Sequence, residues 1–501
     1  MARKHDCRHC RDSPGCYRMD RMTNLLRIAI GCTALLAAPA FALDFSDCEL
    51  KTAKAVSGMA ARCAAFEVPE NRAVPDGRRI TLRVAKVPSR ASTPLPDPIV
   101  FLAGGPGQSA TESFPQVAPA YRQLLGQREV ILVDQRGTGG SHPLKCPMPG
   151  LDDPTAPMPD REEIQQMARD CLAGIDADVA HYTTRDYLAD LEELRTELGI
   201  ERWNIVGGSY GTRVALAYVQ AHPDSLRSVV LDGVVPQDVA LSQDHGRHLD
   251  EALAAQFKRC REDEACHAAF GDPWETLQEL RVRYREAPTT VMVPDPRSRQ
   301  PLETALTEET LALTARLYAY QPETAALLPL LLHQAREGDP QPLLAQARMI
   351  VASLDEMLAH GMQLSVTCSE DVPWLRANPD DTSLIGAAMV TFLQAQCEVW
   401  PVPRAPAAFK QPVDSDLPVL LLSGEFDPVT PPSYAERALA TLGNARHLVA
   451  PGQGHIVQMR GCMPRLLTRF IRDASVAGLD AECVADMSAP GFYLNFNGSA
   501  P

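Results

Sequence analysis

The sequence WNIVGGSYGTRVALAYVQA, residues 203–221, places an apolar run, a glycine-rich turn and an amphipathic segment in direct succession. Residues 203–206 predict a buried strand, and residues 210–221 predict a helix. Between them lies GGSYG, which has the G-x-S-x-G spacing of a sharp strand-to-helix turn that presents a serine at its tip. Ordinary Ser/Gly-rich turns produce the same five residues by chance. Ser209 is therefore a candidate nucleophile whose assignment needs support from other segments.

The same alternation of strand and helix extends on both sides of this turn. Residues 80–87 alternate like a half-buried strand, and a helix over 184–198 is predicted to end at Gly199. Strands joined through helices are parallel, so the fold class is α/β with a mostly parallel central sheet. Short apolar runs that predict further buried strands lie at 99–102, 130–133, 228–231, 417–422 and 446–449.

A helix-rich segment interrupts the strand pattern between about residues 235 and 410, and we expect it to form an inserted helical cap. Its expected helices cover 249–261, 273–287, 308–318, 323–335 and 343–359. The predicted organisation is an upstream segment with a signal peptide (1–42), the first part of the core (43–234), the cap (235–410), the second part of the core (411–483) and a tail (484–501).

Ala103-Gly104-Gly105-Pro106-Gly107 follows the predicted strand 99–102. Glycines let the backbone approach a substrate closely, so this loop is a candidate oxyanion hole. We expect the backbone N–H groups of Gly105 and Tyr210 to be its two donors. The simpler interpretation is an ordinary glycine turn, but the position upstream of the Ser209 turn favours a functional one.

A candidate acid and a candidate base follow the last two predicted strands. Asp427 lies in GEFDPVTPP, residues 424–432, and His455 lies in GQGH, residues 452–455. Glu425 is the second-ranked acid, and His447 is a competing base that lies within a predicted strand. The order Ser209, Asp427, His455 is the chain order of α/β-hydrolase triads, in which the acid orients the histidine and the histidine activates the serine.

These segments, together with VDQRGTGGS at 133–141, resemble the prolyl aminopeptidase and tripeptidyl aminopeptidase branch of the α/β-hydrolases. The resemblance extends from about residue 66 to residue 483. Gly140 stands where that branch more often has a basic residue, and Ala103 stands where the prolyl aminopeptidases have histidine, which favours the tripeptidyl-type members. The resemblance implies an exported serine exopeptidase that cleaves short peptides from a free amino terminus and needs no metal or other cofactor.

An exopeptidase of this kind needs a counter-charge for the α-ammonium group of its substrate, and the resemblance implies that cap carboxylates supply it. Cys368-Ser369-Glu370-Asp371 resembles a motif of the tripeptidyl-like members, so Glu370 and Asp371 are the candidates. Solvated charges beside a disulfide are the competing interpretation. An esterase that uses the same triad is the alternative function, because the cap and not the triad selects the substrate.

Composition excludes several other classes of protein. The 501 residues include 48 Lys and Arg against 63 Asp and Glu, which gives a net charge of −15 and argues against a nucleic-acid partner. The 45% apolar content indicates a globular chain, and no apolar run is long enough to span a membrane. The oligomeric state is left open.

The first 42 residues have the features of an export signal. Arg21 and Arg27 precede the apolar run 28–38, and Ala40-Phe41-Ala42 is an A-x-A cleavage site. We therefore expect a periplasmic or secreted protein. Four of the 14 cysteines precede residue 43, and the remaining ten favour disulfides. The preferred pairs are sequence neighbours: Cys48–Cys63, Cys146–Cys171, Cys260–Cys266, Cys368–Cys397 and Cys462–Cys483.

Overall fold

The computed structural model of the chain describes residues 43–52, 58–146, 159–294, 298–345, 348 and 357–499. The expected export signal and most of the expected helix over 343–359 lie outside the described residues.

A nine-stranded sheet forms the centre of the fold, with the strand order β1-β2-β3-β5-β4-β6-β7-β10-β11. Strands β1 to β3 and the β3–β5 pair are antiparallel, and every other neighbouring pair is parallel. This arrangement confirms the predicted fold class. The strands are β1 (Ser46–Leu50), β2 (Met59–Pro69), β3 (Arg79–Val87), β4 (Ile99–Leu102), β5 (Val130–Val133), β6 (Trp203–Gly208), β7 (Leu226–Asp232), β10 (Val419–Gly424) and β11 (Ala445–Ala450).

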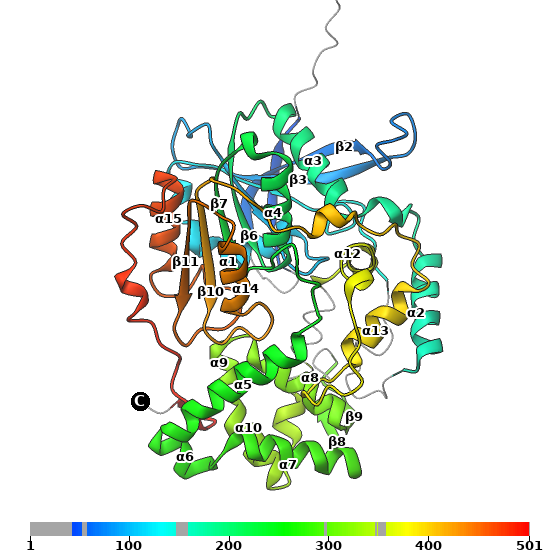
Figure 1. Ribbon diagram of the computed structural model, residues 1–501, viewed down its shortest axis with the longest axis vertical. Helices are drawn as coiled ribbons and strands as arrows, with labels where there is room; N and C mark the ends of the chain where they lie inside the picture. The colour runs from blue at the N-terminus through cyan, green and yellow to red at the C-terminus, as the bar shows by residue number, and fades with distance from the viewer. Residues whose placement is uncertain are drawn as a thin grey trace, which may run out of the picture. The chain divides into compact units, whose positions relative to one another are not determined.

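Helices cover both faces of this sheet (Figure 1). Because successive strand residues point to opposite faces, Val100 and Leu102 join one buried cluster, whereas Ile99 and Phe101 join another. The first cluster includes residues of α3 and α4, and the second includes residues of α1 and α15. The flanking helices are α1 (Ala110–Val117), α3 (Thr184–Glu197), α4 (Tyr210–Ala221), α14 (Pro432–Leu439) and α15 (Met463–Asp473), whereas α2 (Arg161–Ala173) lies beside α13 (Ala388–Cys397).

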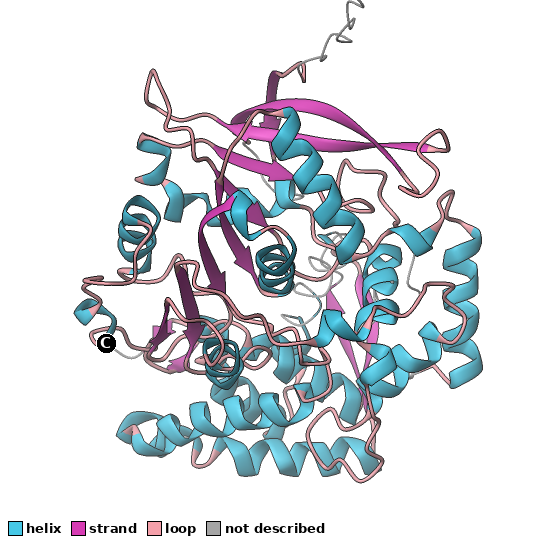
Figure 2. Ribbon diagram, turned by 45° about the horizontal axis from the view of Figure 1, so that its top comes forward, coloured by secondary structure: helices cyan, strands magenta, loops and turns pink. Residues whose placement is uncertain are grey.

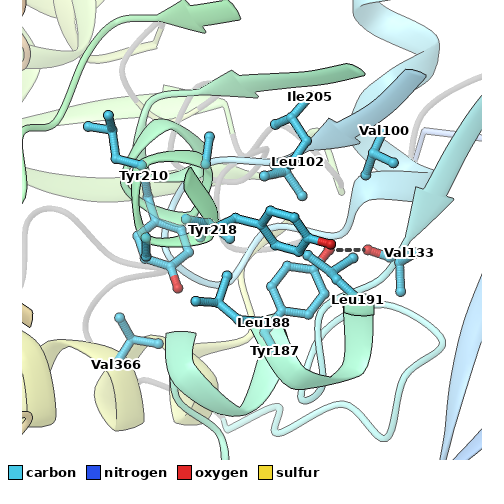
Figure 3. Close-up of a cluster of buried hydrophobic side chains, with 14 of the residues drawn as sticks. Val100, Leu102, Val133, Tyr187, Leu188, Leu191, Ile205, Tyr210, Tyr218 and Val366 are labelled. Carbon is cyan, nitrogen blue, oxygen red and sulfur yellow. Dashed lines mark hydrogen bonds between the residues drawn. The ribbon is translucent and has the colours of Figure 1, made fainter. Parts of the chain in front are cut away.

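Figure 3 shows how the first cluster holds α3 and α4 against the strands. The Tyr187 hydroxyl donates to the carbonyl of Val133 at 2.9 Å, so a buried polar group is satisfied inside an apolar core. Val366 of α12 (His360–Glu370) reaches the same cluster. Although α12 belongs to the region expected to form the cap, it is therefore packed into the core of the sheet.

The region between β7 and β10 is mainly helical and has a buried cluster of its own (Figures 1 and 2). The expected helix over 323–335 is interrupted, because Pro329 occupies the first turn of a new helix. The hairpin β8–β9 was not expected, since most of its residues are exposed and lack a clear alternation. The elements are α5 (His245–Glu262), α6 (Glu264–Phe270), α7 (Pro273–Glu286), β8 (Thr289–Pro294), β9 (Pro301–Leu306), α8 (Glu308–Ala319), α9 (Pro322–Ala325), α10 (Leu328–Arg336), α12 and α13 (Ala388–Cys397).

The end of the chain contacts this same region. Phe492 is buried against Cys260, Cys266 and Phe270, and the N–H of Tyr493 donates to the carbonyl of Ala326 at 3.3 Å. A short hairpin of β12 (Tyr493–Asn495) and β13 (Gly498–Ser499) follows. The tail thus has a defined packing site that its sequence did not indicate.

All five expected disulfides are present, each between the expected partners. Among the described residues, no helix combines the length and the hydropathy needed to cross a bilayer.

Candidate active site

Ser209 lies between β6 and α4 with φ +54° and ψ −124°, a conformation that non-glycine residues rarely adopt. Its N–H donates to the carbonyl of Asp232 at 2.9 Å. A Cβ on Gly207 would lie 2.4 Å from the carbonyl oxygen of Gly211, and a Cβ on Gly211 would lie 2.3 Å from that of Leu102. The turn therefore requires glycine at both ends of G-x-S-x-G, and it holds Ser209 half-buried at the carboxyl edge of the sheet.

Strand register explains why distant segments meet at this edge. Gly208, the last residue of β6, pairs with Asp232 of β7, and Leu422 of β10 pairs with the same residue. Gly424 of β10 pairs in turn with Ala450 of β11. The loops that follow these strand ends therefore converge beside Ser209, in the crevice where open α/β sheets bind ligands.

His455 and Asp427 form a hydrogen-bonded pair within this set of loops. The Nδ1 of His455 lies 2.7 Å from Oδ2 of Asp427, which also accepts the hydroxyl of Thr430 at 2.8 Å. The N–H groups of Val429 and Thr430 donate to Oδ1 of Asp427, each at 2.9 Å. The carboxylate is thus fully held, and it fixes the imidazole with Nε2 free to accept a proton.

Burial and neighbouring groups shift the pKa values of both members of this pair. Burial alone would raise the pKa of Asp427, but the charge and hydrogen bond of His455, with the N–H groups of Thr430 and Val429, hold it below its usual value. Burial likewise opposes protonation of His455, but attraction to Asp427 and then Asp232 raises the pKa of His455 above its usual value. The imidazolium form of His455 is therefore stabilised, as a general base requires.

The two competing candidates have other partners. Glu425 is exposed and accepts the N–H of Gly452 at 2.7 Å. His447 lies within β11, and its Nε2 is 2.9 Å from the hydroxyl of Ser423. Neither contact involves His455.

The histidine loop and the Ser209 turn lie against each other. A Cβ built on Gly208 would be 3.6 Å from Cδ1 of Ile456, the residue after His455. A Cβ on Gly233 would be 3.0 Å from Cε1 of His455 itself. The structure therefore brings Ser209, Asp427 and His455 to one place.

Asp232 connects these two segments, and sequence reasoning did not identify it. Its carbonyl accepts the N–H of Ser209, and its buried carboxylate accepts the N–H of Val457 at 2.9 Å and of Gln458 at 2.9 Å. Burial raises the pKa of Asp232 to about 6. In the sequence Asp232 only ends an apolar run, so the sole available signal was a charged residue at the carboxyl end of a predicted strand.

The expected oxyanion loop lies beside Ser209. A Cβ on Gly104 would be 3.1 Å from Cβ of Ser209, and Gly105 follows with φ +108°. Tyr210 is the first residue of α4, so its N–H is among those left free at a helix start. Gly105 and Tyr210 thus flank the serine from two loops, and their role as donors remains a prediction.

Glu370 is 1% exposed at the end of α12 and holds the start of α3. Its carboxylate accepts the N–H and the hydroxyl of Thr184, each at 2.9 Å. The Thr184 hydroxyl is also 2.6 Å from that of Tyr210, which links Glu370 to the residue after Ser209. Burial raises the pKa of Glu370 to about 7, although the charge of Arg213 and the hydrogen bonds from Thr184 oppose this rise.

Asp371, also 1% exposed, has two cationic partners of its own. Its Oδ1 accepts from Arg213 at 2.7 Å, from Lys410 at 3.0 Å and from the N–H of Leu241 at 2.8 Å. These contacts were not expected, because Arg213 and Lys410 are far from Asp371 in sequence. They distinguish Asp371 from Glu370, which has no such ion pair within the described part of the chain.

The VDQRG segment, residues 133–137, binds two helices beside the site. Asp134 accepts the hydroxyl of Ser109 at 2.7 Å and the N–H of Thr111 at 2.8 Å, which fixes the start of α1. Arg136 forms a fully buried, two-pronged ion pair with Asp190 of α3, both bonds being 2.7 Å. The segment thus joins the loops around the site to two helices.

The region between β7 and β10 covers His455. The carbonyl of Tyr320, just after α8, accepts the N–H of His455 at 2.8 Å. The Tyr320 ring meets the imidazole edge-on, with 5.6 Å between the ring centres. Over the described ranges, no group of three or more His, Cys, Asp or Glu side chains is arranged to hold a metal ion.

Two family profiles match the chain. One, described as the alpha/beta hydrolase fold, matches residues 97–268, and the other, described as TAP-like protein, matches residues 382–483. The proline iminopeptidase of Neisseria gonorrhoeae is 32% identical over 139 residues, which cover 27% of this chain and 32% of that protein. The putative hydrolase YuaR of Escherichia coli is 23% identical over 416 residues, which cover 78% of this chain and 80% of that protein.

The match therefore spans about a third of the length of this curated proline iminopeptidase. Among solved structures, the proline iminopeptidase of Mycobacterium smegmatis aligns with a TM-score of 0.42 and 17% identity, covering 83% of this chain and 99% of that one. The sheet topology, the site and the two profiles agree. The chain has the α/β-hydrolase fold, and it is similar in sequence to the proline iminopeptidases and to the TAP-like proteins.

Proposed function

We propose that this protein is an exported serine exopeptidase that releases short peptides, or single residues, from the free amino termini of peptides. The observation that supports this most directly is the His455–Asp427 pair, 2.7 Å apart, beside the Ser209 turn. This is the arrangement that activates a serine hydroxyl. Similarity to proline iminopeptidases supports peptides as the substrate class.

The reaction is acyl transfer. The hydroxyl of Ser209 attacks the scissile carbonyl while Nε2 of His455 takes its proton, and Asp427 stabilises the imidazolium that forms. The N–H groups of Gly105 and Tyr210 bind the oxyanion. His455 then protonates the leaving amine and activates the water that hydrolyses the acyl-enzyme.

Glu370 is the better candidate for contact with the substrate ammonium. Asp371 is already paired with two cations of the protein, Arg213 and Lys410. Glu370 has only neutral hydrogen-bond donors, and its burial makes the ionised form costly. A cationic partner would offset that cost, so a free substrate amine and Glu370 stabilise each other.

Export to the periplasm or to the medium is part of the proposal. Five disulfides are compatible with it, because disulfides persist in oxidising compartments and are rare in reducing ones.

Three substrates test the activity on purified protein beginning at residue 43. They are Ala-Ala-Pro-p-nitroanilide, its N-acetylated form and p-nitrophenyl butyrate. We expect the free-amine peptide to be cleaved and the acetylated peptide to be nearly inert. Ser209→Ala, which keeps the fold, is expected to lower kcat by about 10⁴–10⁶-fold and serves as the matched control.

The other outcomes contradict separate parts of the proposal. Equal cleavage of the acetylated peptide would remove the ammonium contact at Glu370. Turnover of the ester alone would make the protein an esterase with the same triad. Full activity of Ser209→Ala would overturn the assignment of the nucleophile.

A further inference from the structure

The end of helix α8 is the part of the cap that touches the candidate base. Tyr320 follows α8, accepts the N–H of His455 at its carbonyl, and packs its ring edge-on against the imidazole. Arg316 lies four residues earlier in the same helix. Residues four apart in a helix share a face, so Arg316 is on the side of α8 that faces His455.

The guanidinium of Arg316 is half-buried and has only neutral partners. Its Nη2 is 3.3 Å from the hydroxyl of Tyr320 and 3.5 Å from Nδ1 of His245, and its Nη1 is 3.7 Å from the sulfur of Met389. No Asp or Glu side chain of the described chain lies within ion-pair distance of Arg316. This differs from Arg213, which forms a buried ion pair with Asp371.

His245 lies beside Arg316 and helps to hold its guanidinium. It is the first residue of α5 and is 5% exposed. A guanidinium can only donate, so Nδ1 of His245 accepts from Arg316 and Nε2 carries the proton. This Nε2–H has no hydrogen-bond partner in the described chain, which is a costly arrangement for a buried donor.

The charge of Arg316 is therefore the one that a ligand would meet here. Burial lowers the pKa of His245, and the positive charge of Arg316 acts in the same direction, so His245 is held neutral. The unbalanced guanidinium favours a negative group.

We propose that Arg316 forms a subsite for a carboxylate of the peptide substrate. The carboxylate would accept hydrogen bonds from the guanidinium and balance its charge, while Nδ1 of His245 and the hydroxyl of Tyr320 hold the guanidinium in place. Two sources of carboxylate fit this chemistry: the C-terminal carboxylate of a short peptide and an acidic side chain. The inference rests on the proposed peptidase function.

The test compares three substrates: tetra-alanine with a free C-terminal carboxylate, its C-terminal amide, and the amide with glutamate as the fourth residue. Wild-type kcat/KM is expected to be about tenfold to hundredfold higher for the substrate that carries the recognised carboxylate. Preference for the free acid identifies the C-terminus as the source, and preference for the glutamate peptide identifies the side chain.

The ratio of interest is kcat/KM for the preferred carboxylate substrate divided by kcat/KM for the tetra-alanine amide. Arg316→Gln is expected to bring this ratio close to one. Arg316→Lys, which keeps the charge, is expected to give an intermediate ratio. Arg283→Gln is the matched control, because Arg283 is an exposed cap residue that donates to a backbone carbonyl. Its ratio should equal that of the wild type. A wild-type ratio near one, or an unchanged ratio in both Arg316 variants, would overturn the proposal.

Calorimetry separates this proposal from the proposed function. Ser209→Ala protein is titrated with the three peptides, and the double variant Ser209→Ala/Arg316→Gln is titrated alongside it. The carboxylate subsite predicts weaker binding of the amide to the first protein only. If wild-type protein cleaves no peptide but this difference in affinity persists, the peptidase assignment fails and the subsite stands.

Discussion

At the scale of single residues, the site depends on how two buried carboxylates are compensated. Asp427 is satisfied by His455, Thr430 and backbone N–H groups, so it stays ionised. Glu370 receives only two neutral hydrogen bonds and resists ionisation. Two buried carboxyl groups in one site therefore differ in protonation: that of Asp427 is stabilised as the anion, and that of Glu370 is not.

The Asp427–His455 pair predicts the acid limb of the pH profile. His455 must be neutral to accept a proton, and its raised pKa means that kcat/KM should increase with pH through an apparent pKa above 6.5. Asp427→Asn removes the charge that raises this pKa. We expect the limb to move to lower pH and kcat to fall by about 10⁴-fold. An unmoved limb in the variant would show that another group titrates.

Glu370 predicts a pH-dependent stability. Its pKa is raised from 4.5 to about 7 by burial, so the folded protein favours the protonated form. Stability from this group is complete below pH 4.5 and is lost as the pH rises through about 7. Glu370→Gln cannot ionise, so its Tm relative to wild type should be higher at pH 8 than at pH 5. The exposed Glu197→Gln on α3 should show no such trend in the same melting experiment.

At the scale of elements, the sequence identified buried strands well and exposed or long-range features poorly. Apolar runs gave β4, β5 and β6, because a strand covered on both faces is apolar throughout. The hairpin β8–β9 is mostly exposed and carries no such run. The glycine turn and the order of Ser209, Asp427 and His455 are local signals and were predictable.

The roles of Asp232 and Arg316 depend on register and on a helix contact that no single segment encodes. Asp232 ends β7, and the residues that it holds are those after His455 and the N–H of Ser209. Arg316 is one of several cations in the cap, and only the position of Tyr320 against His455 distinguishes it. Contacts of this kind form only when separate strands and helices pack together, so the sequence of one segment does not predict them.

Asp232→Asn tests the link between β7 and the histidine loop. The N–H of Val457 contacts both carboxylate oxygens, so in either orientation of the amide an NH2 group would face this N–H, and two donors would oppose each other. The loop should shift, and kcat should fall by about tenfold to hundredfold with a smaller change in KM. The control is Asp224→Asn, an exposed residue in the turn before β7. Equal kcat in both variants would contradict a positioning role for Asp232.

At the scale of the whole molecule, disulfides connect each part of the chain to its immediate neighbour in sequence. The five pairs are separated by 15, 25, 6, 29 and 21 residues. Each restricts the unfolded chain and thereby adds about 2–4 kcal/mol to the free energy of unfolding in the loop-entropy model. None of them joins the segment before β7 to the segment after the cap, so noncovalent contacts hold the two parts of the core together, among them the pairing of β7 with β10 and the hydrogen bonds of Asp232 to the histidine loop.

Reduction should therefore destabilise the protein without separating the triad residues directly. We expect Tm to fall clearly in dithiothreitol, and activity below the new Tm to persist. The measurement is a melting curve and a rate assay on the same reduced sample, with free thiols counted after denaturation. Loss of activity at temperatures where the reduced protein is still folded would show that a disulfide shapes the site itself.

The pairing of β7 with β10 also sets an order in which the proposed site can be completed. Ser209 is synthesised before Asp427 and His455, which follow the last two strands of the sheet. In the proposed mechanism a growing chain therefore has the nucleophile without its base. The hydroxyl of Ser209 would be activated only after β10 and β11 have added to the sheet edge formed by β7.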